Sequence, residues 1–194
     1  MKRLFDLLLS ICLLVILFPL FIIISFIIKI SSRGPIFFIQ ERVGKDAKLF
    51  KMIKFRTMYL NQKNTSSITI KGDLRVTKIG VFLRKYKLDE LPELINVVVG
   101  HMSMVGPRPD VSGYADKLVG EDSKIVKLRP GITGPASLKY ANEEEILSSK
   151  DNPKLYNDSI LYPDKVKINL DYYYNNNIWL DIKIIFLTIF RSNY

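Results

Sequence analysis

The sequence predicts an α+β, helix-dominated fold in which a long apolar N-terminal helix precedes a small compact domain. Residues 4–28 are almost wholly apolar, residues 36–40 and 49–55 have the character of short strands, and apolar runs further along the chain have helical spacing. We therefore place a membrane anchor at residues 1–30 and one compact domain at residues 31–194.

The apolar run at residues 4–28 is long enough to cross a bilayer as a helix that rises about 1.5 Å per residue. Basic residues flank both of its ends: Lys2, Arg3, Lys29 and Arg33. Basic flanks favour the cytoplasmic side, and Pro19 removes a helical hydrogen bond near the middle. A re-entrant helix broken at Pro19 satisfies both observations, and a straight spanning helix is the alternative.

The compact domain is expected to begin with a β-hairpin that turns at residues 44–46. Residues 60–72, rich in Asn, Ser, Thr and Lys, predict a mobile loop, and residues 77–86 predict a helix. Residues 178–190 are apolar but too short to span a bilayer. They form either a buried helix or an interfacial amphipathic helix.

Asp89 and Glu90 lie just before an apolar periodic run, and Pro92 suits a first helical turn. The acidic pair is therefore expected at a helix N-terminus, at the junction with the helix of residues 77–86, where the positive end of the macrodipole favours a nearby phosphate. Further along, two prolines fix the backbone of Arg108, whose planar fork suits a phosphate. The alternative is an ordinary N-cap followed by a solvated acid.

Composition is consistent with a membrane-associated protein. Lysine and arginine total 29 against 19 acidic residues, and the net charge of +10 favours an anionic membrane surface or phosphate-rich ligands. The basic residues are dispersed, with neither a zinc-ligand array nor an aromatic-basic signature, so we expect no nucleic-acid partner. The single cysteine, Cys12, excludes an internal disulfide and fits a reducing cytoplasmic setting.

Ordered motifs resemble those of the bacterial sugar transferase family, the small monotopic phosphoglycosyl transferases. They are K-F-R-T-M at 54–58, D-L-R-V-T followed by I-G and L-R at 73–84, L-D-E-L-P to P-R-P at 88–109, R-P-G-I-T-G at 129–134, and L-D-Y and W-L-D-I-K within 170–184. The resemblance also implies the re-entrant anchor.

The chain departs from the family pattern in three places. Phe18 precedes Pro19 where relatives often have serine, and His101 stands where they usually have an acid. The segment at 135–168, which includes a solvated acidic helix start at 143–145, also differs. The sugar carried by the donor is therefore not implied by the resemblance.

The resemblance implies transfer of a sugar 1-phosphate from a UDP-sugar to undecaprenyl phosphate, with release of UMP. Asp89 is the candidate nucleophile, and Glu90 holds Mg²⁺ or handles protons; either acid could ligate the metal. Arg108 is the leading phosphate ligand. The remaining candidates are the cations Lys54, Arg56 and Arg129, and, as weaker predictions from the closing motif, Asp171 and Tyr173.

The resemblance also places the protein at the bacterial inner membrane, with its catalytic domain on the cytoplasmic face. There it would start assembly of a surface polysaccharide or glycoprotein glycan, with downstream glycosyltransferases as possible partners. The sequence has no D-x-D, G-x-G-x-x-G or P-loop motif and only one long apolar segment, which argues against rival enzyme classes. The non-enzymatic alternative is an inert, basic, membrane-anchored binding or scaffold protein.

Overall fold

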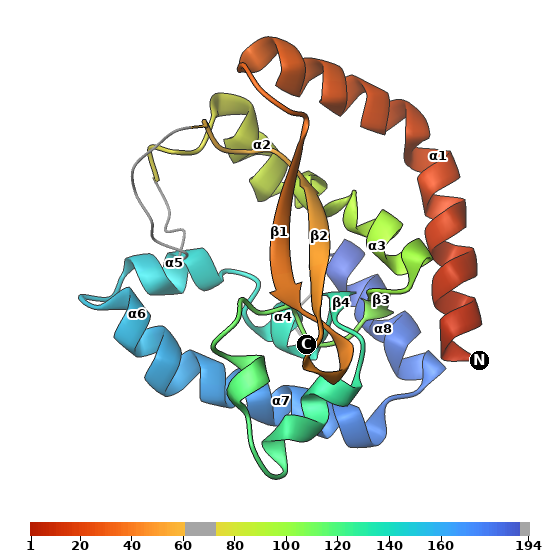
Figure 1. Cartoon of the computed structure of the whole chain (residues 1–194), viewed down its shortest axis with the longest axis vertical. Coiled ribbons are helices and arrows are strands. Elements are labelled where there is room, and N and C mark those ends of the chain that lie inside the picture. Colours follow the sequence, from red (N-terminus) through yellow and green to blue (C-terminus); the bar gives the residue numbers. More distant parts are fainter. Residues whose placement is uncertain (61–72, 191–194) are drawn as a thin grey trace.

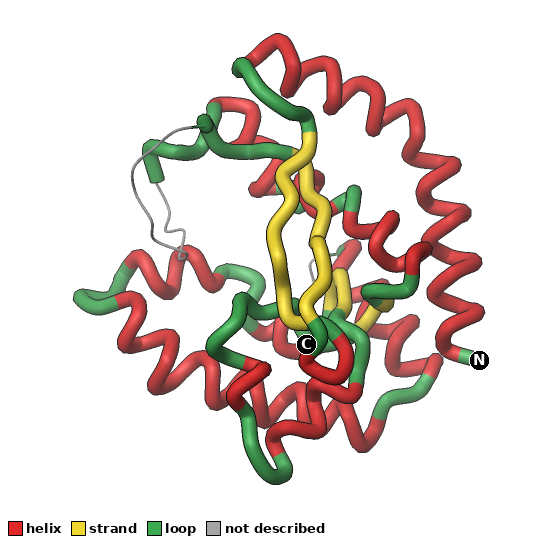
Figure 2. The backbone as a smooth tube through the Cα atoms, in the orientation of Figure 1, coloured by secondary structure: helices red, strands yellow, loops and turns green. Residues whose placement is uncertain are grey.

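The computed structural model describes residues 1–60 and 73–190, in which helices surround a long β-hairpin (Figure 1, Figure 2). The helix-dominated α+β class is confirmed. Nearly all of the loop expected at residues 60–72 lies outside the described residues. In chain order the main elements are α1 (Lys2–Ser31), β1 (Phe37–Val43), β2 (Leu49–Phe55), α2 (Lys78–Lys85), the 3-10 turn η2 (Leu88–Glu90), α3 (Glu93–Val99), β3 (Ser103–Val105), β4 (Gly131–Thr133), α4 (Pro135–Lys139), α5 (Glu143–Ser148), α6 (Pro153–Tyr156), α7 (Tyr162–Asn175) and α8 (Ile178–Ile189).

Helix α1 passes through Pro19 as one continuous helix. The expected break at this proline is therefore wrong: proline removes one N–H donor, and the hydrogen bonds on either side keep the helix intact. Instead, α1 curves around the body of the molecule (Figure 1). Among the described residues, α1 is the one helix long and apolar enough to cross a membrane. About half of its apolar side chains are exposed, and only Ile24 and Ile28 are buried.

Both ends of α1 contact the same body. At the N-terminal end, Lys2 Nζ donates to the Val105 carbonyl at 3.1 Å and to the carboxylate of Asp181 at 2.5 Å. One turn later, the buried carboxylate of Asp6 accepts from the Ser103 hydroxyl at 2.8 Å. The other end of α1 joins an apolar cluster made of Ile24, Ile28, Phe55 and Leu83. Helix α1 is thus attached to the rest of the molecule near both of its ends.

The predicted hairpin is confirmed. Strands β1 and β2 pair antiparallel from Phe37 opposite Phe55 to Val43 opposite Leu49. Helix α3 is tied to this hairpin by the side-chain amide of Asn96. The amide oxygen accepts from the Ile53 N–H at 3.0 Å, and the amide nitrogen donates to the Lys51 carbonyl at 2.7 Å. Asn96 therefore fixes the middle of α3 against β2.

Strands β3 and β4 form a parallel pair that the sequence did not reveal. Their backbones approach closely at two glycines, since a Cβ built on Gly131 would lie 2.1 Å from the Gly106 nitrogen. Gly106 N–H donates to the Thr133 carbonyl at 2.9 Å, and Gly131 N–H donates to the Pro107 carbonyl at 2.8 Å. This pairing fixes the chain immediately before Arg108.

Helix α8, which covers the C-terminal apolar stretch, is buried on one side only. Ile184 and Asp181 are fully buried against the body. On other faces of the same helix, Trp179, Phe186 and Ile189 are exposed, with 81%, 58% and 69% of their surface accessible. One side of α8 is therefore part of the core, and another leaves apolar groups uncovered.

Candidate active site

The acidic pair lies in η2, the short turn between α2 and α3. The junction of two helices predicted from the sequence is confirmed. Thr77 caps α2 by accepting from the Gly80 N–H, and Lys87 adopts a left-handed conformation (φ 56°) that redirects the chain. Asp89 and Glu90 are both buried, with 8% and 7% of their surface exposed. Because α3 begins only at Glu93, the pair occupies a 3-10 turn leading into that helix rather than the helix itself.

Glu90 accepts hydrogen bonds from two cationic side chains, Arg108 and Lys54. Its Oε1 accepts from Arg108 at 2.5 Å and from Lys54 Nζ at 2.9 Å. Burial opposes ionisation of Glu90, but the charges of Arg108 and Lys54 outweigh burial and hold the pKa of this carboxyl well below its usual range. Glu90 is therefore a permanent anion at neutral pH.

Asp89 has a different environment although it is the adjacent residue. Its Oδ1 is buried and has no hydrogen-bond partner among the residues that the structure describes. Burial and the neighbouring charge of Glu90 raise the pKa of Asp89, while Lys54 and Arg84 act in the opposite direction. One carboxylate is thus engaged by cations and the other keeps an oxygen free, which is the division expected of a stabilising group beside a nucleophile.

A third carboxylate, Glu93, belongs to this cluster and was missed by the sequence reasoning. It is 2% exposed, and its Oε1 lies 3.2 Å from Lys54 Nζ. Burial raises the pKa of Glu93 to about 7, against the opposing effect of Lys54. The three-residue spacing from Glu90 was the available signal, because residues three apart on a helix lie on the same side.

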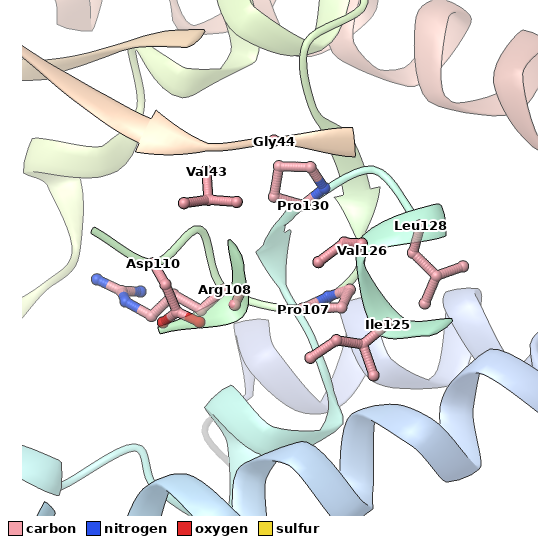
Figure 3. Close-up of a pocket in the computed structure, with 10 residues that line it drawn as sticks. Val43, Gly44, Pro107, Arg108, Asp110, Ile125, Val126, Leu128 and Pro130 are labelled. Carbon is pink, nitrogen blue, oxygen red and sulfur yellow. The ribbon is translucent and has the colours of Figure 1, made fainter. Parts of the chain in front are cut away.

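The segment carrying Arg108 is held by β1. Arg42 donates to the Pro109 carbonyl at 3.3 Å, and the Val43 N–H donates to the Asp110 carbonyl at 2.8 Å. Behind this segment is a small pocket, with Arg108 and Asp110 near one end and apolar side chains near the other (Figure 3). Burial raises the pKa of Asp110 to about 6. This pocket is lined in part by the segment that carries Arg108, and its lining does not include Glu90.

The other predicted site residues have contacts elsewhere. The buried guanidinium of Arg56 donates to the Arg33 carbonyl at 2.8 Å and to the Ser32 carbonyl at 2.7 Å. Arg129 Nε donates to the Gly100 carbonyl at 2.9 Å, at the end of α3 remote from the acidic pair.

The two secondary candidates lie on α7. Asp171 is exposed and accepts from Asn175 at 2.8 Å. Tyr173 makes an edge contact with the ring of Tyr174. The structure therefore brings together Lys54, Asp89, Glu90 and Arg108, and it gives Arg56, Arg129, Asp171 and Tyr173 other neighbours.

Arg84 is an additional cation near the acidic pair. Its Nε donates to the Thr57 hydroxyl at 3.0 Å, and its guanidinium lies 3.6 Å from the carboxylate of Glu144 in α5. The predicted acidic helix start is thus confirmed as the first turn of α5 and faces a charge beside Asp89. Arg84 was part of a sequence motif, but its own role could not be read from that motif.

The acidic pair fits a hard divalent cation that is shared with a ligand. Within the described residues, no group of three or more His, Cys, Asp or Glu side chains is arranged to hold a metal. Magnesium, however, is commonly held by one or two carboxylates and completed by substrate phosphates and water. The free Oδ1 of Asp89 beside Glu90 is compatible with that arrangement.

Comparison with known proteins finds similarity along nearly the whole chain. A family model described as bacterial sugar transferase matches residues 1–193. The chain is 37% identical over 196 residues to the UDP-glucose:undecaprenyl-phosphate glucose-1-phosphate transferase of Klebsiella pneumoniae, covering 98% of this chain and 40% of that protein. It is 34% identical to the UDP-N-acetylgalactosamine-undecaprenyl-phosphate N-acetylgalactosaminephosphotransferase of Aeromonas hydrophila, covering 97% and 42%.

A further relative is similar over nearly its whole length. The chain is 36% identical to the exopolysaccharide production protein PSS of Rhizobium leguminosarum bv. phaseoli, covering 97% of this chain and 93% of that protein. By contrast, the chain spans less than half the length of the Klebsiella and Aeromonas proteins.

Proposed function

Since this chain belongs to the bacterial sugar transferase family, we propose that it transfers a sugar 1-phosphate from a UDP-sugar to undecaprenyl phosphate and releases UMP. The observation that carries the proposal is the unequal acidic pair: Glu90 is engaged by Lys54 and Arg108, while Asp89 keeps a buried oxygen free. A phosphoanhydride substrate needs both a nucleophile and fixed positive charge, and this cluster offers both.

Asp89 is the proposed nucleophile. Its free carboxylate oxygen attacks the phosphorus next to the sugar, and the bond from that phosphorus to the bridging oxygen breaks, so that UMP leaves with the bond's electron pair. An oxygen of undecaprenyl phosphate then attacks the aspartyl-bound phosphorus. Asp89 leaves as a carboxylate, and the product is a polyprenyl diphosphate sugar.

The cations bind and orient the phosphates of the donor. Arg108 offers a planar fork to two phosphate oxygens, and Lys54 offers a point charge. Arg108 and Lys54 both donate hydrogen bonds to the same oxygen of Glu90, which keeps the two cations close to Asp89. Arg56 and Arg129 remain weaker candidates for phosphate contact. Magnesium held by Asp89 or Glu90 together with the donor phosphates would supply neutralisation of oxygen charge.

The membrane location is part of the same proposal. The acceptor is a lipid phosphate, and α1 and one side of α8 expose apolar surface that a bilayer would cover. Both ends of α1 contact one body, through Lys2 at one end and Ile28 at the other. We propose that α1 enters and leaves the bacterial inner membrane by its cytoplasmic face, where the reaction begins a surface glycan for downstream glycosyltransferases.

The test is intact-protein mass after incubation with Mg²⁺ and a panel of UDP-sugars, without lipid acceptor. We compare the wild type with Asp89→Asn and with Asp46→Asn, a matched change at an exposed residue. A sugar-phosphate mass increase on the wild type and Asp46→Asn alone is expected. If undecaprenyl phosphate elicits no UMP release from any donor, and no adduct forms, the chain is an inert membrane-bound protein and the proposal fails.

A further inference from the structure

Arg3, near the start of α1, reaches the far end of the helix that follows the acidic pair. Its Nη1 donates to the Val97 carbonyl at 2.6 Å, and its Nη2 donates to the Val98 carbonyl at 3.0 Å. These carbonyls belong to the last turn of α3, where few backbone N–H donors remain; the Val97 carbonyl also accepts from the Gly100 N–H at 3.0 Å. Arg129 donates to the carbonyl of Gly100, the residue that ends the helix.

Two arginines therefore cap the C-terminal end of α3. Positive charge at this end is favourable, because the helix carbonyls concentrate partial negative charge there. The planar fork of Arg3 suits two successive carbonyls in a way that a lysine ammonium, a single point charge, does not. The basic flank of α1 thus has a structural contact that a simple preference for the cytoplasmic side would not require.

Helix α3 spans about 10 Å at the usual helical rise. Leu94 and Val97 pack it into the core, and polar side chains hold it at three further places. Asn96 ties its middle to β2, and the arginines hold one end. At the other end, Lys54 contacts both Glu93 and Glu90. Because α3 has only seven residues and follows the acidic turn closely, we expect loss of the contacts at its capped end to shift the end that carries that turn.

We propose that Arg3 is a positioning residue for the transfer reaction, fixing α3 so that Asp89 and Glu90 keep their geometry. The catalytic part of this inference rests on the proposed function. Arg3 touches neither carboxylate and acts through the helix backbone. Catalytic groups tolerate little displacement, since an error of about 1 Å can cost a factor of about 100 in rate. The N-terminus of the membrane helix is thereby part of the active-site scaffold.

The test uses Arg3→Lys, which keeps the positive charge and removes the fork. Its matched control is Arg33→Lys, the same change at the exposed basic residue that follows α1. For the purified full-length protein in detergent micelles, we measure kcat and donor KM for UMP release with undecaprenyl phosphate. Hydrogen exchange of peptides covering α3 is measured in parallel. Membrane attachment is checked by extraction of membranes at alkaline pH.

For Arg3→Lys we expect kcat to fall about tenfold, equivalent to about 1.4 kcal/mol, with donor KM within about twofold of wild type. Exchange in the last turn of α3 should become faster, while exchange in the β1–β2 hairpin and membrane attachment stay unchanged. Arg33→Lys should match the wild type. This pattern separates a cap from a charge that only sets membrane orientation, because both variants retain every positive charge.

Three results would overturn the inference that Arg3 positions the carboxylates. Unchanged kcat and exchange in Arg3→Lys would mean that Arg3 serves only as a flanking charge. Faster exchange with unchanged kcat would mean that Arg3 caps α3 without positioning the carboxylates, which also overturns the proposal. A wild type that releases no UMP would refute the proposed function and, with it, the catalytic role of Arg3, while the exchange measurement would still decide whether Arg3 holds α3.

Discussion

Replacing Asp181 by asparagine is expected to loosen α1 from the body. Asp181 is fully buried in α8 and accepts from Lys2 Nζ at 2.5 Å through one oxygen. Its other oxygen accepts from the hydroxyl of Tyr172. An asparagine amide has a single acceptor oxygen and no charge. The two donors now bond to different oxygens of Asp181, and the amide oxygen can take only one of these positions, so one donor loses its acceptor and the Lys2 ammonium loses its anion.

The magnitude follows from the burial of the two partners. Removing one partner of a fully buried ion pair costs about 3–5 kcal/mol. The side chain of Lys2 is 31% exposed, so water compensates for part of the loss, and about 2–3 kcal/mol is a suitable expectation. For a domain of this size, that corresponds to a fall of about 4–12 °C in the thermal midpoint.

The assay is thermal unfolding in detergent micelles, followed by the fluorescence of Trp179, the single tryptophan, which lies on α8 two residues before Asp181. The double variant Lys2→Met/Asp181→Leu, which removes both charges, should recover at least half of the lost midpoint. The exposed change Asp46→Asn should have no effect. A midpoint for Asp181→Asn within about 1 °C of wild type would refute the reasoning that this pair holds α1 to the body.

Three further predictions concern the acidic cluster and the strands beside it. Burial raises the pKa of Glu93 from its usual value of 4.5 to about 7, so the folded protein binds this proton more tightly than the unfolded chain. The free energy of unfolding should therefore fall between about pH 4.5 and 7, by at most about 3 kcal/mol, and Glu93→Gln should flatten this part of a chemical-denaturation profile. Glu90→Gln removes the anion shared by Arg108 and Lys54 and should lower UMP release at saturating donor about 100-fold, whereas an unchanged rate would exclude a role for this carboxylate. Gly131→Ala places a Cβ 2.1 Å from the Gly106 nitrogen and should cost about 2 kcal/mol or more in unfolding free energy, measured by denaturant titration; a cost near zero would contradict the close approach of β3 and β4.

Local sequence signals predicted the elements that depend on neighbours in the chain. Two apolar runs and the polar turn between them predicted the β1–β2 hairpin, and Thr77 marked the start of α2. The position of Asp89 at the junction between two helices followed from the same kind of signal. The predicted break at Pro19 was wrong because the local rule identifies the residue that lacks a helical N–H donor, but not whether the helix ends there.

Contacts between distant segments could not be derived in this way. Lys54 and Arg56 are two residues apart in one motif, yet Lys54 contacts Glu90 and Arg56 contacts the segment after α1. Arg56 lies one residue beyond β2, where the strand no longer dictates the direction of its side chain. Glu93 was missed because its importance depends on Lys54, which is 39 positions away (93 − 54).

The sequence by itself determined the long apolar N-terminal helix, the hairpin, the family and the acidic pair, because periodicity, turn chemistry and ordered motifs are properties of the chain alone. Only the tertiary structure decided that Glu90 holds two cations while Asp89 keeps a free oxygen, and that Arg3 reaches α3. Burial and charge pairing set these differences, and both depend on which remote segments pack together.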